Sequence, residues 1–274
     1  KVTSTDEPET PTPNDEYIHG KWKLVEDASK LQFGMEIIIA SVAENSAIKT
    51  MGEQRNNNRG AVESVLDGEN LKPAVGTTLI TLEDCQLYEG LFALKTKDGY
   101  LYAASSSSNH LKSQEGINNN ACWTITITEG VAAVVATNSD NRNIMRYNET
   151  SDLFSCYASG QKDIALYAKV PEHRRTTSAG RYGTICLPGN IVKCLGATLY
   201  EVAGKDGLRV VFDEVLTPEA GMPYIFLAHN AEVLFYCGDQ TAAVGNHNSL
   251  YGTFTVLQNT ELEGKYLPVD RFQY

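Results

Sequence analysis

Residues 91–127 read LFALKTKDGYLYAASSSSNHLKSQEGINNNACWTITI, and this stretch indicates the class of fold. It holds four short apolar runs, LFAL, YLYAA, HLKS and WTITI, of which HLKS is the least apolar. Short runs rich in Tyr, Phe, Ile and Thr that are divided by Asp-Gly, Ser and Asn segments are typical of β-strands. Because such a unit cannot bury its apolar face alone, it needs partners elsewhere in the chain.

The same grouping of four runs occurs three times between residues 35 and 169. The first group is MEIIIAS, SAIKTM, AVESVL and TLITLE, the second is LFALKT, GYLYAAS, NHLKS and CWTITI, and the third is VAAVVAT, NIMRYN, LFSCYAS and DIALYAK. A threefold repeat of a four-strand unit predicts a β-trefoil, and three copies are too few to close a propeller. The repeats are imperfect, because the loop GEQRNNNRG lengthens the first. A Greek-key or up-and-down barrel therefore stays open as a second interpretation.

The chain is predicted to form two all-β domains behind a polar leader. Residues 1–19 begin with KVTSTDEPETPTPNDE, a Pro/Thr-rich and acidic segment that predicts a disordered tether. We expect a β-trefoil-like domain over residues 20–170 and a β-sandwich-like domain over residues 175–274, divided at VPEHRRTTSAG. Alternation in ATLYEVAG and LRVVFDEV indicates strands with one buried and one solvated face, as in a sandwich. Because the chain ends in strand-like sequence, a continuation of the second domain beyond residue 274 is left open.

Charge and hydropathy bear on the partners of the chain. A formal net charge of −11, from 23 basic and 34 acidic residues, repels phosphate backbones, so nucleic acid is not an expected partner. No stretch approaches the roughly 18 apolar residues of a membrane-spanning helix, and the first residues are too polar for a signal peptide. The sequence therefore predicts no transmembrane segment.

No spacing in the sequence predicts a metal site, a cofactor or a catalytic nucleophile. The five histidines are scattered, and the motifs HxxxH, HExxH, GxSxG, GxxxxGK[ST] and GxGxxG are all missing from the sequence. The six cysteines lack the CxxC spacing of a zinc or redox site, and most lie in strand-like runs, so we interpret them as buried thiols. One or two disulfides stay open, since an even count in an exported protein permits them. The cysteines are Cys85, Cys122, Cys156, Cys186, Cys194 and Cys237.

Five segments of the first domain stand out together, namely WKLVEDASKLQFGMEIIIAS, RNNNRGAV, GYLYAASSSSNHLKSQ, ACWTITITEGVAAVVATNSDNRNIMRYN and LFSCYASGQKDIALY. They resemble a module of secreted and surface proteins of Bacteroidetes over residues 22–169. In the second domain, RYGTICLP, GATLYEV and GMPYIFLA are similar to another accessory β domain of such proteins. The acidic leader resembles the segment after the lipid-modified cysteine of exported lipoproteins, although an interdomain linker is the alternative. The resemblance implies export to the periplasm or cell surface, with a lipid anchor upstream of residue 1, and no reaction.

Aromatic and amide side chains of the first domain are the candidate ligand-binding residues. A sugar site needs a flat aromatic face for the apolar side of a pyranose and fixed amide, carboxylate or guanidinium groups for its hydroxyls. Alternation in GYLYAA places Tyr100 and Tyr102 on one face and Leu101 on the other. The candidates are Tyr100, Tyr102, Asn109, Arg142, Tyr147 and Tyr157, with Asn148 as a further amide.

Three side chains in the same region have structural interpretations. Trp123 lies in a four-residue apolar run, so we expect it in the core and not at a ligand. Arg59 and Arg142 lie among asparagines in QRNNNRG and NSDNRN, where Asn adopts left-handed turns and Arg caps carbonyls. We expect structural roles for both arginines, with recognition as the alternative.

The sequence predicts a non-catalytic binding or adhesion protein of the cell surface or periplasm, with glycans or cell-surface proteins as its partners. Purely structural accessory domains of a larger extracellular assembly are the close alternative. A polysaccharide hydrolase that uses a carboxylate pair is the third interpretation. It stays open because such a pair depends on a separation in space that a sequence does not reveal.

Overall fold

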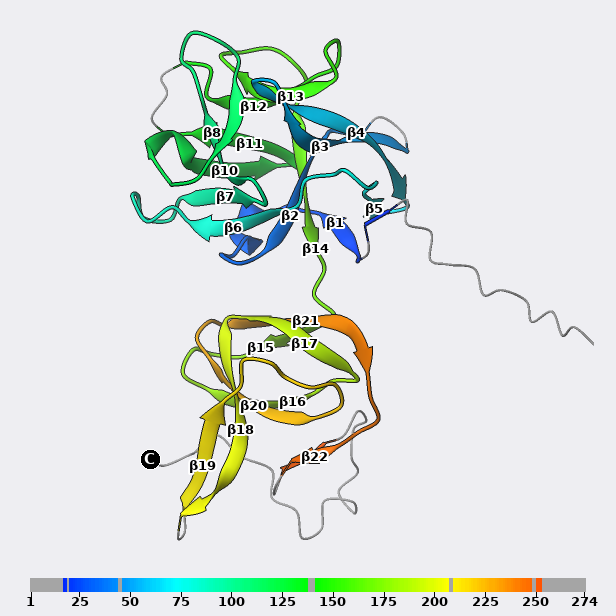
Figure 1. Cartoon of the computed structure of the whole chain (residues 1–274), viewed down its shortest axis with the longest axis vertical. Coiled ribbons are helices and arrows are strands. Elements are labelled where there is room, and N and C mark those ends of the chain that lie inside the picture. The colour runs from blue at the N-terminus through cyan, green and yellow to red at the C-terminus, as the bar shows by residue number, and fades with distance from the viewer. Residues whose placement is uncertain are drawn as a thin grey trace, which may run out of the picture. The chain divides into compact units, whose positions relative to one another are not determined.

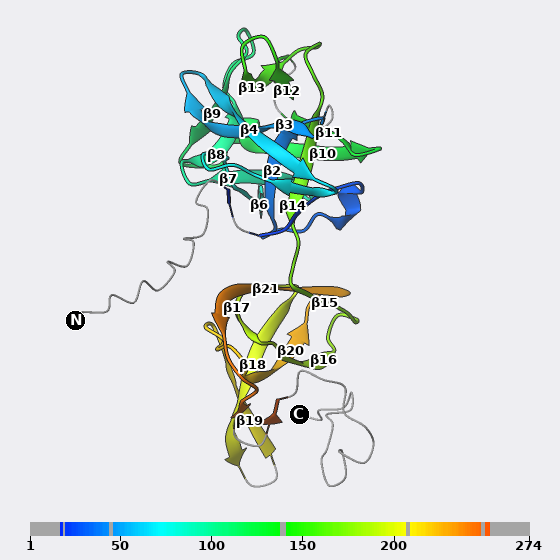
Figure 2. The same cartoon turned by 90° about the vertical axis from the view of Figure 1, so that its right-hand side faces the viewer.

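The computed structural model of the chain describes residues 17–18, 20–43, 46–137, 141–206, 209–247 and 250–252. It divides into two compact units, Lys1–Val170 (unit 1) and Pro171–Tyr274 (unit 2), drawn in Figures 1 and 2. Most of the predicted tether, residues 1–16 and 19, lies outside the described residues. Within the described residues, strands are joined by turns and two 3-10 helices, without an α-helix, which confirms the all-β prediction.

Six strands of unit 1 pair side by side, each antiparallel to two neighbours, and together they close into a ring. Because the last strand of the ring pairs again with the first, the ring leaves no free edge of the kind that recruits other strands. In ring order the strands are β2 (Glu36–Ser41), β6 (Ile80–Asp84), β7 (Phe92–Thr96), β10 (Cys122–Thr128), β11 (Val131–Ala136) and β14 (Ile164–Lys169).

Three hairpins lie between ring strands in the sequence. They are β3 (Ala47–Arg55) with β4 (Asn58–Asp67), β8 (Gly99–Ala103) with β9 (Leu111–Gln114), and β12 (Ile144–Asn148) with β13 (Leu153–Tyr157). Each of the twelve runs singled out in the sequence coincides with a strand, and each group of four supplies two ring strands and one hairpin. The weakly apolar HLKS run is β9. The first and third hairpins are also joined to each other, because β13 pairs with β4.

The sequence of strand β2, EIIIAS, is apolar without alternation because both faces of the strand are buried. Ile38 and Ala40 belong to a buried cluster with Trp22, Leu71 and Tyr167, which lies on one face of the strand. The alternate residues Ile37 and Ile39 point to the other face and are also completely buried. The first face is covered by β1 (Trp22–Leu24), which pairs with both β14 and β5 (Asn70–Lys72). A strand buried on both faces reads as a continuous apolar run.

The Asp-Gly signal within residues 91–127 marks a tight turn between β7 and β8. Thr96 pairs with Gly99 across the turn, and the Thr96 hydroxyl donates a hydrogen bond of 2.9 Å to the Gly99 carbonyl. Gly99 has φ +109°, and a Cβ there would lie 2.3 Å from the Gln114 carbonyl oxygen. Only glycine fits this position, because both the backbone conformation and the close approach exclude a side chain.

The described residues of unit 2 form two antiparallel sheets and a short strand pair. One sheet has the order β15 (His173–Thr176), β21 (Glu232–Thr241), β17 (Gly189–Leu195), and the other β16 (Tyr182–Cys186), β20 (Pro223–Ala228), β18 (Ala197–Asp206), β19 (Arg209–Glu214). The short pair is β22 (Asn246–His247) with β23 (Leu250–Tyr251).

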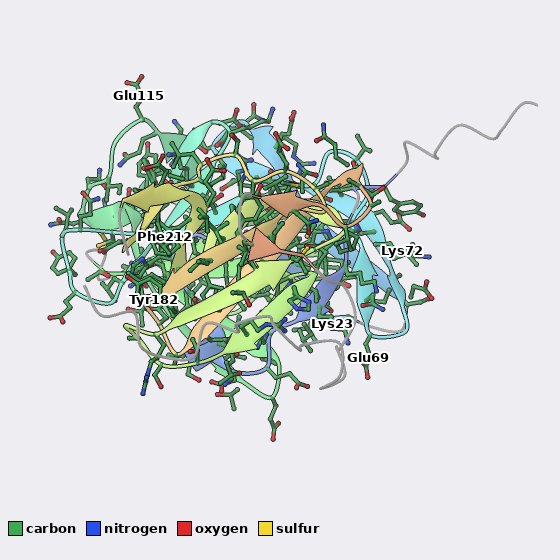
Figure 3. All side chains as sticks on the ribbon, turned by 90° about the horizontal axis from the view of Figure 1, so that it is seen from below. Lys23, Glu69, Lys72, Glu115, Tyr182 and Phe212 are labelled. Atoms are coloured by element: carbon green, nitrogen blue, oxygen red, sulfur yellow. The ribbon has the colours of Figure 1, made fainter. Side chains whose placement is uncertain are left out.

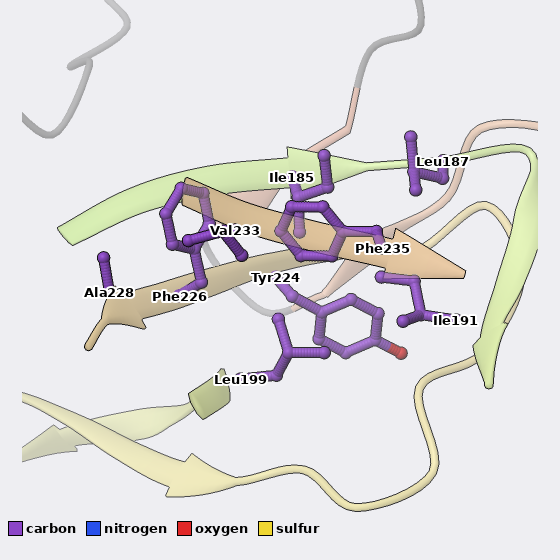
Figure 4. Close-up of a cluster of buried hydrophobic side chains, with 9 residues drawn as sticks. All are labelled: Ile185, Leu187, Ile191, Leu199, Tyr224, Phe226, Ala228, Val233 and Phe235. Atoms are coloured by element: carbon purple, nitrogen blue, oxygen red, sulfur yellow. The ribbon is translucent and has the colours of Figure 1, made fainter. Parts of the chain in front are cut away.

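The two sheets of unit 2 share one buried cluster, shown in Figure 4. Leu199 and Phe226 come from the second sheet, while Val233 and Phe235 come from the first. The rings of Phe226 and Phe235 meet edge to face with centroids 5.7 Å apart, a favourable aromatic geometry. Side chains from both sheets therefore build one common core.

We expect Ile38→Ala to lower the free energy of unfolding of unit 1 by about 2 to 5 kcal/mol, because it opens a cavity in a completely buried cluster. Urea denaturation of the purified chain measures the loss. Val75→Ala is the control, since Val75 is 62% exposed, and its effect should stay within about 0.5 kcal/mol. Equal losses in the two variants would contradict the assignment of Ile38 to the core.

Candidate functional site

A surface hollow of about 620 Å³ lies where the first and third strand groups of unit 1 meet. The first group contributes the end of β2, the start of β3 and one residue of β4. The third contributes the start of β11, the end of β12 and the turns that flank β13. The lining residues are Ser41, Val42, Ala47, Ile48, Lys49, Glu63, Val131, Tyr147, Glu149, Asp152, Lys162 and Asp163.

Three lysine ion pairs lie around this hollow, and one of them, Lys49 with Asp152, joins the two strand groups. The Lys49 Nζ atom, on β3, lies 3.6 Å from Glu63 Oε2 on the neighbouring strand and 3.8 Å from Asp152 Oδ1 in the third group. Lys162 Nζ lies 3.8 Å from Glu149 Oε2. These side chains are partly exposed, so each pair contributes little to stability and remains accessible to a ligand.

Tyr147 is a buried aromatic residue in the lining of the hollow. Its side chain is 5% exposed, its ring centroid lies 5.1 Å from that of Phe154, and its hydroxyl donates a hydrogen bond of 2.9 Å to Asp152 Oδ1. Burial, followed by the hydrogen bond to Asp152, raises the pKa of the Tyr147 phenol. Its backbone also exchanges two hydrogen bonds with Lys162, which holds that residue beside the hollow.

Asn148 and Tyr157 support the turn that presents Asp152. The Asn148 side-chain amide donates to the Tyr157 hydroxyl at 2.9 Å, and its carbonyl oxygen accepts from the Ser151 backbone at 3.0 Å. Asp152 adopts a left-handed conformation with φ 49°, which Asp and Asn tolerate better than most residues. Both predicted candidates therefore lie next to the hollow, and their polar groups are used within the protein.

Tyr100 and Tyr102 lie on β8, in the second strand group, and are not among the lining residues of the hollow. Alternation places Leu101 on the completely buried face and leaves both tyrosines partly exposed. The Tyr100 hydroxyl donates to Glu83 Oε2 at 2.7 Å, and the hydrogen bond to Glu83 raises the pKa of this phenol. Lys95 Nζ lies 5.5 Å from the centre of the Tyr100 ring. These tyrosines form a second polar and aromatic surface.

Asn109 and Arg142 are brought together by the fold. The Arg142 guanidinium donates a hydrogen bond to Asn109 Oδ1, which joins the loop between β8 and β9 to the segment before β12. Arg142 has φ 56°, a left-handed conformation. Neither residue lines the hollow, and their contact ties the second strand group to the third.

Arg59 and Trp123 are interior residues; the sequence predicted a core position for Trp123 and a structural role for Arg59. Trp123 is completely buried and donates from Nε1 to the Leu101 carbonyl at 3.0 Å. Arg59 is also completely buried, and burial lowers the pKa of its guanidinium while Asp98 opposes that shift. The partners of Arg59 are Gly52 O at 3.0 Å, Thr78 Oγ1 at 2.7 Å, Ser113 Oγ at 3.3 Å and Asp98 Oδ2 at 3.7 Å.

Sequence reasoning named Tyr147 but missed the charged residues around it. Lys49 and Asp152 lie about a hundred positions apart in the sequence, and single charges in loops and strand ends are usually solvated surface. Only the pairing of β4 with β13 and of β2 with β14 brings these segments together. No local motif could have identified them.

The residues that the structure describes contain no group of three or more His, Cys, Asp or Glu side chains able to hold a metal ion. Among the same residues, no helix has the length and apolar character needed to cross a membrane. In comparisons with known proteins, no family model and no curated protein matches the chain.

We expect Arg59→Ala to cost roughly 3 kcal/mol or more of the unfolding free energy of unit 1, because it removes a buried cation from four polar partners. Lys23→Ala is the control, because Lys23 forms an exposed pair of 3.3 Å with Glu69 (Figure 3) and should cost less than about 1 kcal/mol. Chemical denaturation compares the two. A loss for Arg59→Ala no larger than that for Lys23→Ala would argue against the structural role.

Tyr147→Phe should cost about 1 kcal/mol near neutral pH, because it removes the hydrogen bond to Asp152. The folded chain raises the pKa of Tyr147 above the value of about 10 for a free tyrosine, so it binds the phenolic proton more tightly than the unfolded chain. The stabilisation of the folded chain by the protonated Tyr147 phenol is complete below about pH 10 and is lost as the pH rises further. Urea titrations should show a constant difference between wild type and variant below that pH and a shrinking one above it. A difference in unfolding free energy that grows with pH would contradict the assignment of a raised pKa to Tyr147.

Proposed function

We propose that unit 1 is a β-trefoil-like domain and that unit 2 is a β-sandwich-like domain. The support for the first is a closed ring of six strands with three intervening hairpins, in which each sequence group supplies two ring strands and one hairpin. The support for the second is the pair of antiparallel sheets with a common apolar core.

We infer that the chain is a non-catalytic binding or adhesion protein of the cell surface or periplasm, and that glycans bind in the hollow of unit 1. The observation that supports this proposal is the composition of the hollow. Val42, Ile48 and Val131 give it apolar parts, and around them Lys49 and Asp152 offer hydrogen-bond donors and acceptors. Ligand sites combine an apolar surface with a few converging polar groups in this way, and sugars present both kinds of surface.

The surroundings of the carboxylates favour binding over catalysis. The side chains of Glu63 and Asp152 are 77% and 46% exposed, and both already face Lys49. A glycosidase holds its acid in a desolvated setting and separates it from the second carboxylate by a defined gap. The carboxylates of the hollow are instead solvated members of ion pairs. Structural accessory domains of a larger extracellular assembly are the remaining alternative.

A glycan array probed with the intact chain tests this proposal, followed by titration of any glycan that is retained. Asp152→Asn keeps the size and the left-handed turn but removes the charge, and Lys49→Met removes the ammonium that joins the two strand groups. Each should weaken binding about ten- to a hundredfold, since a hydrogen bond to a charged group contributes about 1.5 to 3 kcal/mol and each 1.4 kcal/mol is tenfold in affinity.

Two further variants separate the alternatives. Lys72→Met is the matched control, because Lys72 forms an exposed 2.7 Å pair with Asp67 and projects from the surface in Figure 3, so affinity should not change. Tyr102→Ala probes the second aromatic surface and should also leave affinity unchanged. Loss of binding in Tyr102→Ala alone would move the site to β8. An array without any retained glycan would overturn the glycan proposal in favour of structural accessory domains.

A further inference from the structure

Charged residues line the hollow of unit 1, and the acids among them outnumber the bases. The acids are Glu63, Glu149, Asp152 and Asp163, and the bases are Lys49 and Lys162. Arg146 adds a third cation through its salt bridge to Asp163, although it is not itself a lining residue. Four negative charges therefore face three positive ones, and the net charge of the site has the same sign as the −11 of the whole chain.

The ion pairs around Lys49 leave the carboxylates closer to solvent than the ammonium. The Lys49 side chain is 33% exposed, whereas those of Glu63 and Asp152 are 77% and 46% exposed. The Lys49 Nζ atom lies 3.6 Å and 3.8 Å from their oxygens, beyond the roughly 2.7 to 2.9 Å of a charge-assisted hydrogen bond. Lys49 therefore offsets part of their charge without occupying the lone pairs of either carboxylate.

The other two ion pairs have the same order of exposure. The side chain of Arg146 is 22% exposed and that of Asp163 is 54% exposed. The corresponding fractions are 50% for Lys162 and 64% for Glu149. In every pair the cation is the more buried partner, so a ligand that enters the hollow meets carboxylate oxygens before it meets a cation.

The rest of the lining suits a small polar ligand with an apolar side. Val42 is 40% exposed and offers a contact for the apolar face of a ring. The Tyr147 hydroxyl already donates to Asp152 Oδ1, which leaves Asp152 Oδ2 to accept from a ligand. The volume of about 620 Å³ lies within the roughly 300 to 1,000 Å³ of small-molecule sites, so a short oligosaccharide has room there.

We propose that the hollow selects amino sugars, that is, glycans with a free protonated amine, over N-acetylated and acidic glycans. The inference rests on the proposed function, which places a glycan in this hollow. A sugar ammonium has three donors for the exposed oxygens of Glu63 and Asp163, and its charge complements the net charge of the site. A uronic acid or a sulfated sugar would instead meet like charges, which is how an interface rejects the wrong partner.

Titration calorimetry with the full chain tests the inference on three oligosaccharides of equal length. They are an oligomer of glucosamine, an oligomer of N-acetylglucosamine and an oligogalacturonate. At about pH 6 an amine with the pKa of about 8 of an α-amino group is protonated. The glucosamine oligomer should bind roughly fivefold to twentyfold more tightly than the acetylated one, as one or two exposed ion pairs allow. This affinity ratio should approach one in about 1 M salt, where the Debye length is only about 3 Å.

Variants that change charge in opposite directions should move the ratio in opposite directions. Glu63→Gln and Asp163→Asn each remove a negative charge and should lower the ratio about two- to fivefold, whereas Lys162→Met removes a positive charge and should raise it. Asp67→Asn is the matched control, because Asp67 forms an exposed ion pair with Lys72 and is not a lining residue. The ratio cancels the hydrogen bonds that the two oligomers share, so it isolates the contribution of charge.

The possible failures separate the inference from the proposed function. Equal affinities for the glucosamine and acetylated oligomers, or tighter binding of the acetylated or acidic one, would overturn the preference for amines and leave glycan binding intact. A preference that Glu63→Gln and Asp163→Asn both leave unchanged would place the amine outside the hollow and overturn the inference as well. Absence of binding by the glucosamine oligomer would also overturn it, and the glycan array alone would then decide the proposed function.

Discussion

The pairing of β14 with β2 is the constraint on which unit 1 depends, because it closes the ring of six strands. Five residue pairs, from Ile164 opposite Ser41 to Ala168 opposite Ile37, join strands more than a hundred residues apart. Without this contact β2 and β14 would be edge strands, and their apolar outer faces would lose the cluster around Trp22. Loop closure over so long a segment costs conformational entropy, which burial on both faces of β2 must offset.

The same closure creates the hollow. It sets the end of β2 and the start of β3 beside the turns around β13, so that Lys49, which already lies opposite Glu63 in the β3–β4 hairpin, can also reach Asp152. Tyr147 and Asn148 then hold the Asp152 turn through hydrogen bonds of 2.9 Å and 3.0 Å. The proposed binding site is therefore a product of how the first and third groups meet, and no single group contains it.

The parts of the fold that the sequence predicted are those that depend on local chemistry. Tyr, Ile and Thr in short runs predicted the strands, and the Asp-Gly step predicted the turn at which Gly99 alone can fit. Trp123 and Arg59 were expected to be structural and are completely buried. The candidate site was harder, because the polar groups of Tyr100, Asn109 and Tyr157 are used within the protein while the charges around Tyr147 carry no local signal.

The buried guanidinium of Arg59 has a consequence for how β4 aligns with its neighbours. Its partners come from β3, β9 and two connecting segments, so they converge only when β4 has its native alignment. A slip of one residue would turn every side chain of β4 to the opposite face and leave a cation without these oxygens. The cost of an unpaired buried charge is far larger than that of a lost apolar contact. Arg59 thereby selects one strand register among several that the polar and apolar pattern of this long hairpin would otherwise allow.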